Sequence, residues 1–533
     1  MTINSPISFR HLGLFFLSCL LITGVIYYPS FAVPFYLDDY RSIVENQALM
    51  NGDFYQYVVN RRAIPHLSIW IDYQLWGNEP TFFHVQNIML HILNALLVFV
   101  LVNQLVQLAT GKQQLWLAVF VALVWLVHPL NSQPVIYIVQ RMTLWVAFFS
   151  LLALISWLKF RTTSSKKPLY FIAAGVFTFG ALFSKETAVT LPLLFVLADL
   201  VIVKVPRKQL LKEYAIVAAI GLAIAVVLFA VGKISFASLD AMTREHPEMT
   251  RWGYFWAQQE IVALYLYKFF VPWPLFLEYP FYQEASFASA WLWFLLHVAI
   301  VGTAVALVRH APLVTFGVLF YYICHLVESS FIPITDLAFE HRNYLPNVGF
   351  TLAIGWLLSA ALRPVDRQGV IALAVIVVVG FSTLTTFRAL QWQNQLAFYQ
   401  REIQHHPEIP RLHYNVGYIY VNRGQLQSAE AYFRQAFFIA WQQDRVTLQV
   451  ISGIMEIFFL RNDFDSLQRL IMELEQSFMD NAPWRSRLYS ILSMLYINAG
   501  HCDIAADYLA AALEIDPENS QAHQLIAQCA AQP

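Results

Sequence analysis

Long apolar runs separated by short polar connections dominate the first 390 residues of this chain. A helix needs about 20 apolar residues to cross a hydrocarbon core roughly 30 Å thick, so these runs predict about eleven spans. Inside a bilayer, helices satisfy their own backbone polar groups, which favours an all-α polytopic domain. The runs cover residues 12–30, 87–108, 115–131, 142–159, 169–184, 187–203, 214–232, 290–308, 312–332, 346–362 and 369–387.

The composition agrees with a membrane protein and excludes one class of partner. Of the 533 residues, 58% are hydrophobic and only 13% are charged, whereas soluble domains carry about 25% charged residues. The mean hydropathy of +0.53 indicates that most of the chain lies in lipid. A net charge of −1 and the lack of a basic tract argue against a nucleic-acid partner.

The charges of the loops decide how a twelfth apolar segment, 254–272, is interpreted. It contains Gln258, Gln259 and Lys268, which favours an interfacial or re-entrant segment. If it does not cross, the basic loops lie on the cytoplasmic side together with the N-terminus, as expected for positive loops. This topology places outside the cytoplasm the loops 33–86, 234–289 and 333–345 and the C-terminal domain.

The first run also has a feature of a signal peptide, because Ser30-Phe31-Ala32 resembles a cleavage site. The run is long for a signal peptide, which favours a retained span. Residues 33–86 lie outside the cytoplasm in both cases.

After about residue 400 the chain becomes polar and shows a helical repeat. The spacing of small and aromatic residues fits the tetratricopeptide pattern, a helix-turn-helix of about 34 residues. Residues 400–533 therefore predict an α-solenoid of about three repeats, close to the minimum for a stable array. The positions that carry the pattern are Gly417, Tyr420, Gly424, Ala429, Phe433 and Ala436, then Asn462, Leu467 and Ile471, then Leu492, Tyr496, Gly500, Ala505, Leu509, Ala512 and Pro517.

None of the four cysteines has the spacing of a metal site. Cys19 and Cys324 lie in apolar runs and are expected to be small core residues. Cys502 and Cys529 share the C-terminal domain. Unpaired helix-core thiols are the favoured interpretation, with pairing as the alternative if this domain faces an oxidising compartment.

Two adjacent aspartates, Asp38 and Asp39, follow the first apolar run. Neighbouring carboxylates repel each other and lose hydration at the edge of a bilayer, which indicates a use for a metal, a proton or a cationic partner. Carboxylates opposite Arg, Lys and His at one surface suit a lipid-linked phosphate, because cations bind phosphate and a carboxylate deprotonates a hydroxyl. The remaining candidates near the predicted outer surface are Arg62, His91, His128, Arg141, Lys185, Glu186, Glu340, His341, Arg342 and Tyr344.

Simpler structural roles stay open for several of these residues. Asp39 could cap a short interfacial helix, and Arg141 and Lys185 could be anchors at the lipid interface. Lys185 and Glu186 could form a local ion pair. His91 and Asn94 could join neighbouring helices by hydrogen bonds. The run Glu340-His341-Arg342 lies between apolar stretches, so we expect it to be buried against the membrane domain.

Five stretches together resemble the transmembrane and tetratricopeptide-repeat O-mannosyltransferase family of the GT-C superfamily. The resemblance covers roughly residues 30–350, and the trailing repeats match the layout of that family. The stretches are Tyr36-Leu37-Asp38-Asp39, His84 to Asn94, His128-Pro129 with Gln140-Arg141, Ser184-Lys185-Glu186-Thr187, and Glu340-His341-Arg342-Asn343-Tyr344-Leu345-Pro346.

The resemblance implies an inverting transfer of a sugar from a polyprenyl-phosphate donor to an acceptor hydroxyl on the extracytoplasmic side of the membrane. We expect this membrane to be a bacterial inner membrane. It implies Asp38 or Asp39 as general base, and family position favours Asp39. Mg²⁺ or Mn²⁺ is a candidate cofactor, with these two carboxylates as ligands. The implied phosphate ligands are Arg141, Lys185, His341 and Arg342, supported by Arg62, His91, His128, Glu186, Glu340 and Tyr344.

The acceptor and the sugar stay open. The acceptor is a protein Ser or Thr, a pilin-like subunit or a glycan, and the repeat domain is a candidate for holding it. A ligase or polymerase of lipid-linked glycans is a second enzymatic hypothesis. A non-catalytic membrane scaffold does not need the ionisable cluster, and a transporter would show internal symmetry and broken helices at the midplane.

Overall fold

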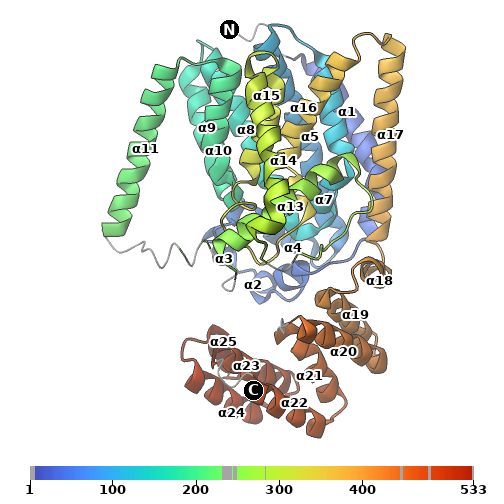
Figure 1. Cartoon of the computed structure of the whole chain (residues 1–533). Coiled ribbons are helices and arrows are strands. Elements are labelled where there is room, and N and C mark those ends of the chain that lie inside the picture. The colour runs from blue at the N-terminus through green and yellow to red at the C-terminus, as the bar shows by residue number, and fades with distance from the viewer. Residues whose placement is uncertain are drawn as a thin grey trace. The chain divides into compact units, whose positions relative to one another are not determined.

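The computed structural model describes residues 7–230, 240, 243, 249–281, 284–443, 448–477 and 482–530. This part of the chain forms helices and turns and contains no β-strand, which confirms the all-α prediction. It divides into two compact units, Met1–Asn394 and Gln395–Pro533 (Figure 1). Much of 234–248 in the predicted outer loop 234–289 lies outside the described residues.

Each predicted apolar run of the first unit contains helix among the described residues. Among the described helices, six are long and apolar enough to cross a membrane, or seven if the bent pair Leu115–Val127 and Pro129–Ile136 is one span. The count of about eleven therefore stays a prediction. The apolar helices are α1 (Phe9–Ile26), α5 (Pro80–Thr110), α6 (Leu115–Val127), α8 (Arg141–Thr162), α9 (Lys167–Leu182), α10 (Leu191–Leu197) continued by η6 (Ala198–Val203), α11 (Arg207–Ala230), α14 (Phe287–Ala306), α15 (Pro312–His325), α16 (Pro346–Ala361) and α17 (Arg367–Gln391).

The other described helices of this unit lie in the connections between the apolar helices. They are η1 (Tyr28–Ala32), η2 (Tyr40–Val44), α2 (Gln47–Met50), α3 (Phe54–Val58), α4 (Ala63–Trp76), η3 (Pro129–Asn131), α7 (Gln133–Ile136), η4 (Ile138–Gln140), η5 (Glu186–Thr190), α13 (Arg251–Phe270), η7 (Leu307–Arg309) and η8 (Glu340–Asn343). In Figure 1, α13 crosses obliquely in front of α14 and α15 instead of running alongside them. This orientation agrees with the predicted interfacial or re-entrant segment.

Helix α5 is the longest of the helices described in this unit, and its ends follow from its sequence. Pro80 at its first position needs no hydrogen-bond donor there, and Gly111 ends it in the left-handed conformation with φ +71°. The helix packs against α1, α6 and α8. It therefore brings Asn87, His91 and Asn94, which share one face, into the interior.

The predicted span 312–332 is too long, because α15 ends at His325. The carbonyl of Glu328 accepts hydrogen bonds from the Tyr254 hydroxyl at 2.5 Å and from Nη1 of Arg342 at 3.3 Å. These donors hold the chain in a non-helical turn, so Glu328 lies in a loop instead of in a span.

Two glycines let α15 and α16 approach closely. A Cβ added at Gly317 would lie 2.2 Å from the carbonyl oxygen of Gly349. Small residues are common where membrane helices touch, because they let the backbones come together.

We predict that Gly317→Ala lowers the stability of the protein by about 1–3 kcal/mol, because a methyl group does not fit between the backbones. Gly380→Ala is the matched control, since no atom lies within 4 Å of a Cβ at that position of α17. Thermal unfolding in detergent measures both. Equal melting temperatures for the two variants would contradict the close packing.

The second unit is built of helix pairs joined by the same kind of turn. Gly424, Asn462 and Gly500 stand at equal spacings in these turns and have positive φ angles of 70°, 57° and 83°. In each turn the next residue donates its backbone N–H to a carbonyl five positions back, the Schellman pattern that ends a helix. The helices are α18 (Gln395–His405), α19 (Pro410–Asn422), α20 (Leu426–Gln442), α21 (Leu448–Leu460), α22 (Phe464–Ser477), α23 (Ala482–Asn498), α24 (Cys502–Ile515) and α25 (Ser520–Ala530).

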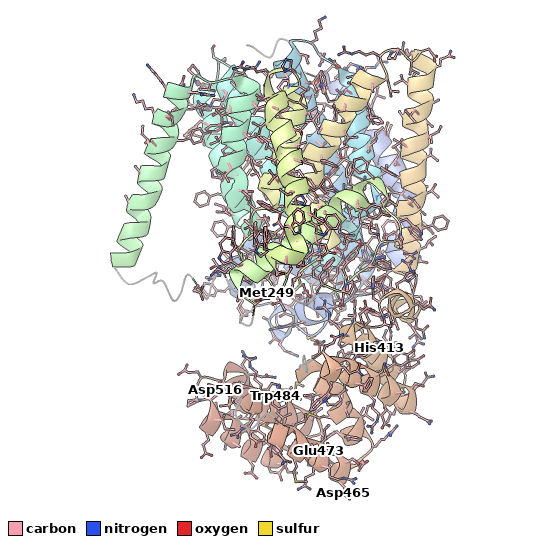
Figure 2. The ribbon with its side chains drawn as sticks, in the orientation of Figure 1. Met249, His413, Asp465, Glu473, Trp484 and Asp516 are labelled. Atoms are coloured by element: carbon pink, nitrogen blue, oxygen red, sulfur yellow. A yellow bond between two sulfur atoms is a disulfide. The ribbon has the colours of Figure 1, made fainter. Side chains whose placement is uncertain are left out.

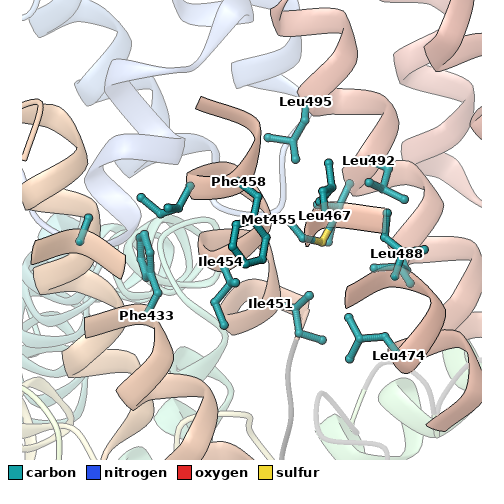
Figure 3. Close-up of a cluster of buried hydrophobic side chains, with 14 residues drawn as sticks. Phe433, Ile451, Ile454, Met455, Phe458, Leu467, Leu474, Leu488, Leu492 and Leu495 are labelled. Atoms are coloured by element: carbon teal, nitrogen blue, oxygen red, sulfur yellow. The ribbon is translucent and has the colours of Figure 1, made fainter. Parts of the chain in front are cut away.

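One hydrophobic cluster joins α20, α21, α22 and α23 (Figure 3). It extends from Phe433 on α20 through Met455 on α21 to Leu492 on α23. The ring of Phe433 lies against both Gly417 and Gly453, where any Cβ would come within 2.6 Å of it. Pattern positions of all three repeats, such as Phe433, Leu467 and Leu492, lie in this cluster, whereas Ala505, Leu509 and Ala512 lie in a second one, as expected for stacked repeats of a solenoid.

The prediction that Cys502 and Cys529 are unpaired thiols is wrong. Cys502 and Cys529 form a disulfide with a Cα–Cα distance of 5.7 Å. Their sequence positions did not indicate this bond, because it depends on how α24 and α25 pack. The packing brings the first residue of α24 beside the end of α25. Cys19 and Cys324 are free and buried, as expected.

Candidate functional site

The two adjacent aspartates have different environments. Asp39 is only 1% exposed. Its Oδ2 accepts the backbone N–H of Tyr36 at 3.0 Å, and its Oδ1 accepts that of Val139 at 2.8 Å. Burial raises the pKa of Asp39 to about 7, opposed by these backbone hydrogen bonds. Its carboxylate therefore joins the first loop to η4, and it does not cap η2, where it stands at the N-cap.

Asp38 is the exposed member of the doublet. The Tyr137 hydroxyl donates to Oδ2 of Asp38 at 3.1 Å and accepts the backbone N–H of Asp38 at 3.0 Å. These two bonds fix the orientation of Asp38 while its carboxylate stays open to solvent. The structure therefore favours Asp38 over Asp39 as the carboxylate that a substrate can reach.

Arg141 is a predicted phosphate ligand whose hydrogen-bonding groups are already used. Its Nη1 lies 2.6 Å from Oδ2 of Asp72, and both side chains are buried. Nε donates to Asn87 at 2.7 Å, and Nη2 donates to the carbonyl of Phe83 at 2.9 Å. Arg141 is not a lipid-interface anchor, and its partners leave it a structural role joining α8 to α4 and α5.

His91 and Tyr344 belong to a network between helices. The Tyr344 hydroxyl lies 2.7 Å from Nδ1 of His91 and accepts from Asn94 at 3.2 Å, while Nε2 of His91 lies 2.9 Å from the carbonyl of Leu126. A ring nitrogen facing a carbonyl carries the proton, so Nδ1 accepts from the tyrosine. The alternative that His91 and Asn94 join helices is confirmed.

The ring nitrogens of His128 and the carboxylate oxygens of Glu340 also contact protein groups. The two ring nitrogens of His128 contact the carbonyl of Phe269 at 3.0 Å and the backbone N–H of Leu130 at 3.2 Å. Oε1 of Glu340 accepts from the backbone of Phe276 at 2.7 Å and from the Tyr279 hydroxyl at 2.8 Å. Its Oε2 lies 3.4 Å from Arg388. These contacts anchor η3 and η8 to their neighbours.

The other three predicted phosphate ligands line one cavity. Its volume of about 20 Å³ is enough for roughly one water molecule. Lys185 and Glu328 form an ion pair in it with 2.8 Å between Nζ and Oε1. Burial alone would raise the pKa of Glu328, but the charges of Lys185 and Arg342 hold it at about 2. The lining residues are Thr143, Val146, Lys185, Thr187, Thr190, Cys324, Glu328, His341, Arg342, Leu345 and Pro346.

Hydrogen bonds determine the protonation of His341. Oε1 of Gln133 accepts the backbone N–H of His341 at 2.8 Å, which identifies that atom as the amide oxygen. The same oxygen lies 3.1 Å from Nδ1 of His341, so Nδ1 carries a proton and Nε2 of the neutral ring is an acceptor. Burial, followed by the charge of Lys185, lowers the pKa of His341 well below its usual range.

Arg342 uses its guanidinium to order the loop before η8. Nη1 donates to the carbonyl of Leu337 at 2.7 Å, and Nη2 donates to that of Asp336. Its Nε is a buried donor with no partner among the described atoms, and so is Nε2 of Gln133. Two buried donors beside His341 are therefore free to bind an oxygen atom of a ligand.

Helix α7 connects Asp38 with this cavity. Its first residue, Gln133, contacts His341, and Tyr137, which follows its last residue, contacts Asp38. A helical rise of about 1.5 Å per residue separates Gln133 and Tyr137 by roughly 6 Å along the chain. The exposed carboxylate and the cationic cavity therefore belong to one region.

Arg62 and Glu186 form a partly exposed ion pair of 2.9 Å. Nη1 of Arg62 lies 3.2 Å from the sulfur of Met142, next to the cavity residue Thr143. The expected local pair between Lys185 and Glu186 does not form, because each side chain contacts another partner.

Glu328 and Asp72 are site residues that the sequence alone did not single out. Glu328 was hidden inside an apolar run predicted to be a span. Asp72 stands in an amphipathic segment of the first loop, where a carboxylate is ordinary. A carboxylate near the end of an apolar run, as in Glu328, was the available signal.

The doublet does not fit a divalent ion bound by both carboxylates. Both oxygens of Asp39 accept backbone N–H groups, so they do not face an ion beside Asp38. Over the residues that the structure describes, no group of three or more His, Cys, Asp or Glu side chains has a metal-binding arrangement.

A separate groove of about 1140 Å³ lies on the second unit. Its walls are α20, α21 and α22, and Glu473 of its α22 wall is labelled in Figure 2. Phe438 and Trp441 in this groove are each more than half exposed. Contiguous exposed apolar patches are typical of interaction surfaces, which makes this groove a candidate site for another molecule.

We predict that Arg141→Met destabilises the protein by about 3–5 kcal/mol, because it leaves the buried carboxylate of Asp72 without its cationic partner. Adding Asp72→Asn should recover part of this loss, since it removes the unpaired charge at nearly the same side-chain volume. Thermal unfolding and size-exclusion chromatography measure the effect. A single variant of normal stability that no longer binds a lipid phosphate would make Arg141 a ligand instead.

Comparisons with known proteins agree with the sequence resemblance. A model of the tetratricopeptide repeat matches residues 410–437. The chain is 24% identical over 432 residues to protein O-mannosyl-transferase F38B6.6 of Caenorhabditis elegans, covering 74% of this chain and 58% of that protein. It is 23% identical over 470 residues to human protein O-mannosyl-transferase TMTC4, covering 75% of this chain and 63% of that protein.

The aligned part thus spans less than two thirds of both relatives. No solved structure matches the chain. The resemblance to tetratricopeptide-repeat O-mannosyl-transferases is confirmed, and it extends over about three quarters of the chain.

Proposed function

We propose that the chain is a membrane glycosyltransferase that moves a sugar, with inversion, from a polyprenyl-phosphate donor to an acceptor hydroxyl. The observation that supports this most is the grouping of Lys185, His341 and Arg342 around one cavity. It lies in the same region as an exposed carboxylate. Similarity to two proteins named O-mannosyl-transferases supports the same reaction class.

In this proposal Asp38 is the general base. The Tyr137 hydroxyl holds its orientation, and its exposure gives an acceptor hydroxyl access. As the acceptor oxygen attacks the anomeric carbon, Asp38 takes its proton. Asp39 has a positioning role, because it holds the loop that carries Asp38 against η4.

Lys185 and Arg342 stabilise the departing phosphate. Charge develops on the phosphate as its bond to the sugar breaks, and fixed cations in a site that excludes water stabilise it strongly. The buried N–H donors of Arg342 and Gln133 supply hydrogen bonds to phosphate oxygens. His341, with Nε2 as an acceptor, receives a hydrogen bond from a hydroxyl of the sugar or of the acceptor.

The reaction takes place on the extracytoplasmic side in this proposal. The distribution of basic loops supports this orientation. The disulfide of Cys502 and Cys529 supports it independently, because disulfides persist in oxidising compartments and are rare in the cytosol.

The acceptor is a polypeptide with a Ser or Thr, and the groove of the second unit binds it. The exposed aromatics Phe438 and Trp441 provide apolar contacts for its side chains. A protein acceptor suits this surface better than a glycan, because the aromatics lie beside aliphatic residues such as Ile454 and Leu470.

We predict that Asp38→Asn lowers kcat by about 10²–10⁴-fold with little change in thermal stability, because only the base is removed. Asp39→Asn should instead destabilise the fold by about 1–3 kcal/mol, since its amide group would face a backbone N–H. A transfer assay with a polyprenyl-phosphate sugar and melting curves separate the two effects. Wild-type turnover in Asp38→Asn would exclude this base.

We predict that Trp441→Ala raises the KM for a protein acceptor by roughly 30-fold, the effect of removing an aromatic binding hot spot. The KM for the donor should not change. Met472→Ala is the matched control, because Met472 lies on the wall helix α22, is 53% exposed and does not line the groove. Equal acceptor KM values for both variants would show that the groove does not bind the acceptor.

A further inference from the structure

Glu328 is a carboxylate in a cavity that, by the proposed function, receives a negatively charged phosphate. Its side chain is 12% exposed and pairs with Lys185 at 2.8 Å. A carboxylate repels a phosphate, so its presence weakens the binding of every anionic ligand. A role for Glu328 must therefore explain what the site gains from weaker binding.

The charges of the lining residues sum to a small positive value. Lys185 and Arg342 are cations, Glu328 is an anion, and the hydrogen bonds of His341 with Gln133 fit a neutral imidazole. The net charge of the cavity is therefore +1. A ligand group with one negative charge neutralises it, whereas a dianion leaves an excess negative charge.

The two lipid phosphates of the proposed reaction differ in this respect. The donor is a phosphodiester with one negative charge. When the acceptor oxygen forms its bond to the anomeric carbon, the bond from that carbon to the phosphate oxygen breaks and its electron pair stays on the phosphate. Asp38 takes the proton of the acceptor, and the lipid product is a monoester with two negative charges.

We infer that Glu328 is a specificity-determining residue that matches the cavity to the monoanionic phosphodiester donor and favours release of the dianionic monoester product. This inference rests on the proposed function. Product release limits the rate of many enzymes, so a residue that weakens product binding raises turnover. The cavity of about 20 Å³ must widen to admit a phosphate, and the separation of the flexible Lys185 and Glu328 side chains opens it.

The experiment measures the binding of two probes to the purified full-length protein in detergent. The probes are geranylgeranyl monophosphate and its methyl diester, at about pH 8, where the monoester is a dianion because its second pKa is about 6. The variants are Glu328→Gln, which removes the charge, and Glu328→Asp, which keeps it. Glu45→Gln is the matched control, an exposed carboxylate that does not line the cavity.

We expect Glu328→Gln to shift the ratio of the two dissociation constants toward the monophosphate by at least about tenfold, the effect of one nearby charge. Glu328→Asp and Glu45→Gln should keep the ratio of the wild type. In a transfer assay, Glu328→Gln should show a first turnover followed by slow turnover, because product leaves slowly.

Two results would overturn the inference while leaving the proposed function intact. An unchanged ratio of the two dissociation constants in Glu328→Gln would show that Glu328 does not select the ligand by its charge. An equal weakening of both probes would mean that Glu328 only positions Lys185. If the wild type binds neither probe and Lys185→Met does not change the rate in the transfer assay, the proposed function itself fails. Melting curves for each variant separate these results from unfolding.

Discussion

Charged side chains buried in an apolar helical unit need partners, and this constraint organises the whole first unit. Removing a charge from water costs several kcal/mol unless another charge and hydrogen bonds compensate it. Arg141 pairs with Asp72, Arg161 with Asp199 and Arg388 with Glu340, in each case between separate elements. These pairs determine which helices and loops meet, because each partner would otherwise be buried alone.

The requirement that buried charges have partners also separates the charged groups that bind only protein atoms from those that can bind a ligand. His91, His128, Arg141 and Glu340 direct their polar atoms to protein groups, so a ligand would have to break existing bonds. Around the cavity, Arg342 and Gln133 keep buried donors without partners. Asp38 and Asp39 differ for the same reason, since backbone N–H groups occupy both oxygens of only one of them.

The second unit follows a simpler rule, in which one turn recurs along the chain. Only glycine, or asparagine at some cost, adopts positive φ readily. Gly424, Asn462 and Gly500 therefore mark the helix pairs in the sequence as well as in the structure. The disulfide between Cys502 and Cys529 was not predictable in this way, because pairing depends on the distance between two helices and not on local conformation.

The sequence by itself determined the helical class, the positions of the apolar helices, the repeat turns and several of the candidate site residues, among them Lys185, His341 and Arg342. These features depend on local hydropathy, backbone preference and residue type. Only the tertiary structure decided that Lys185, His341 and Arg342 meet Glu328, that Arg141 is already paired, and that Asp38 is exposed while Asp39 is buried. The physical reason is that the availability of a charged group depends on the partners that folding brings to it from distant parts of the chain.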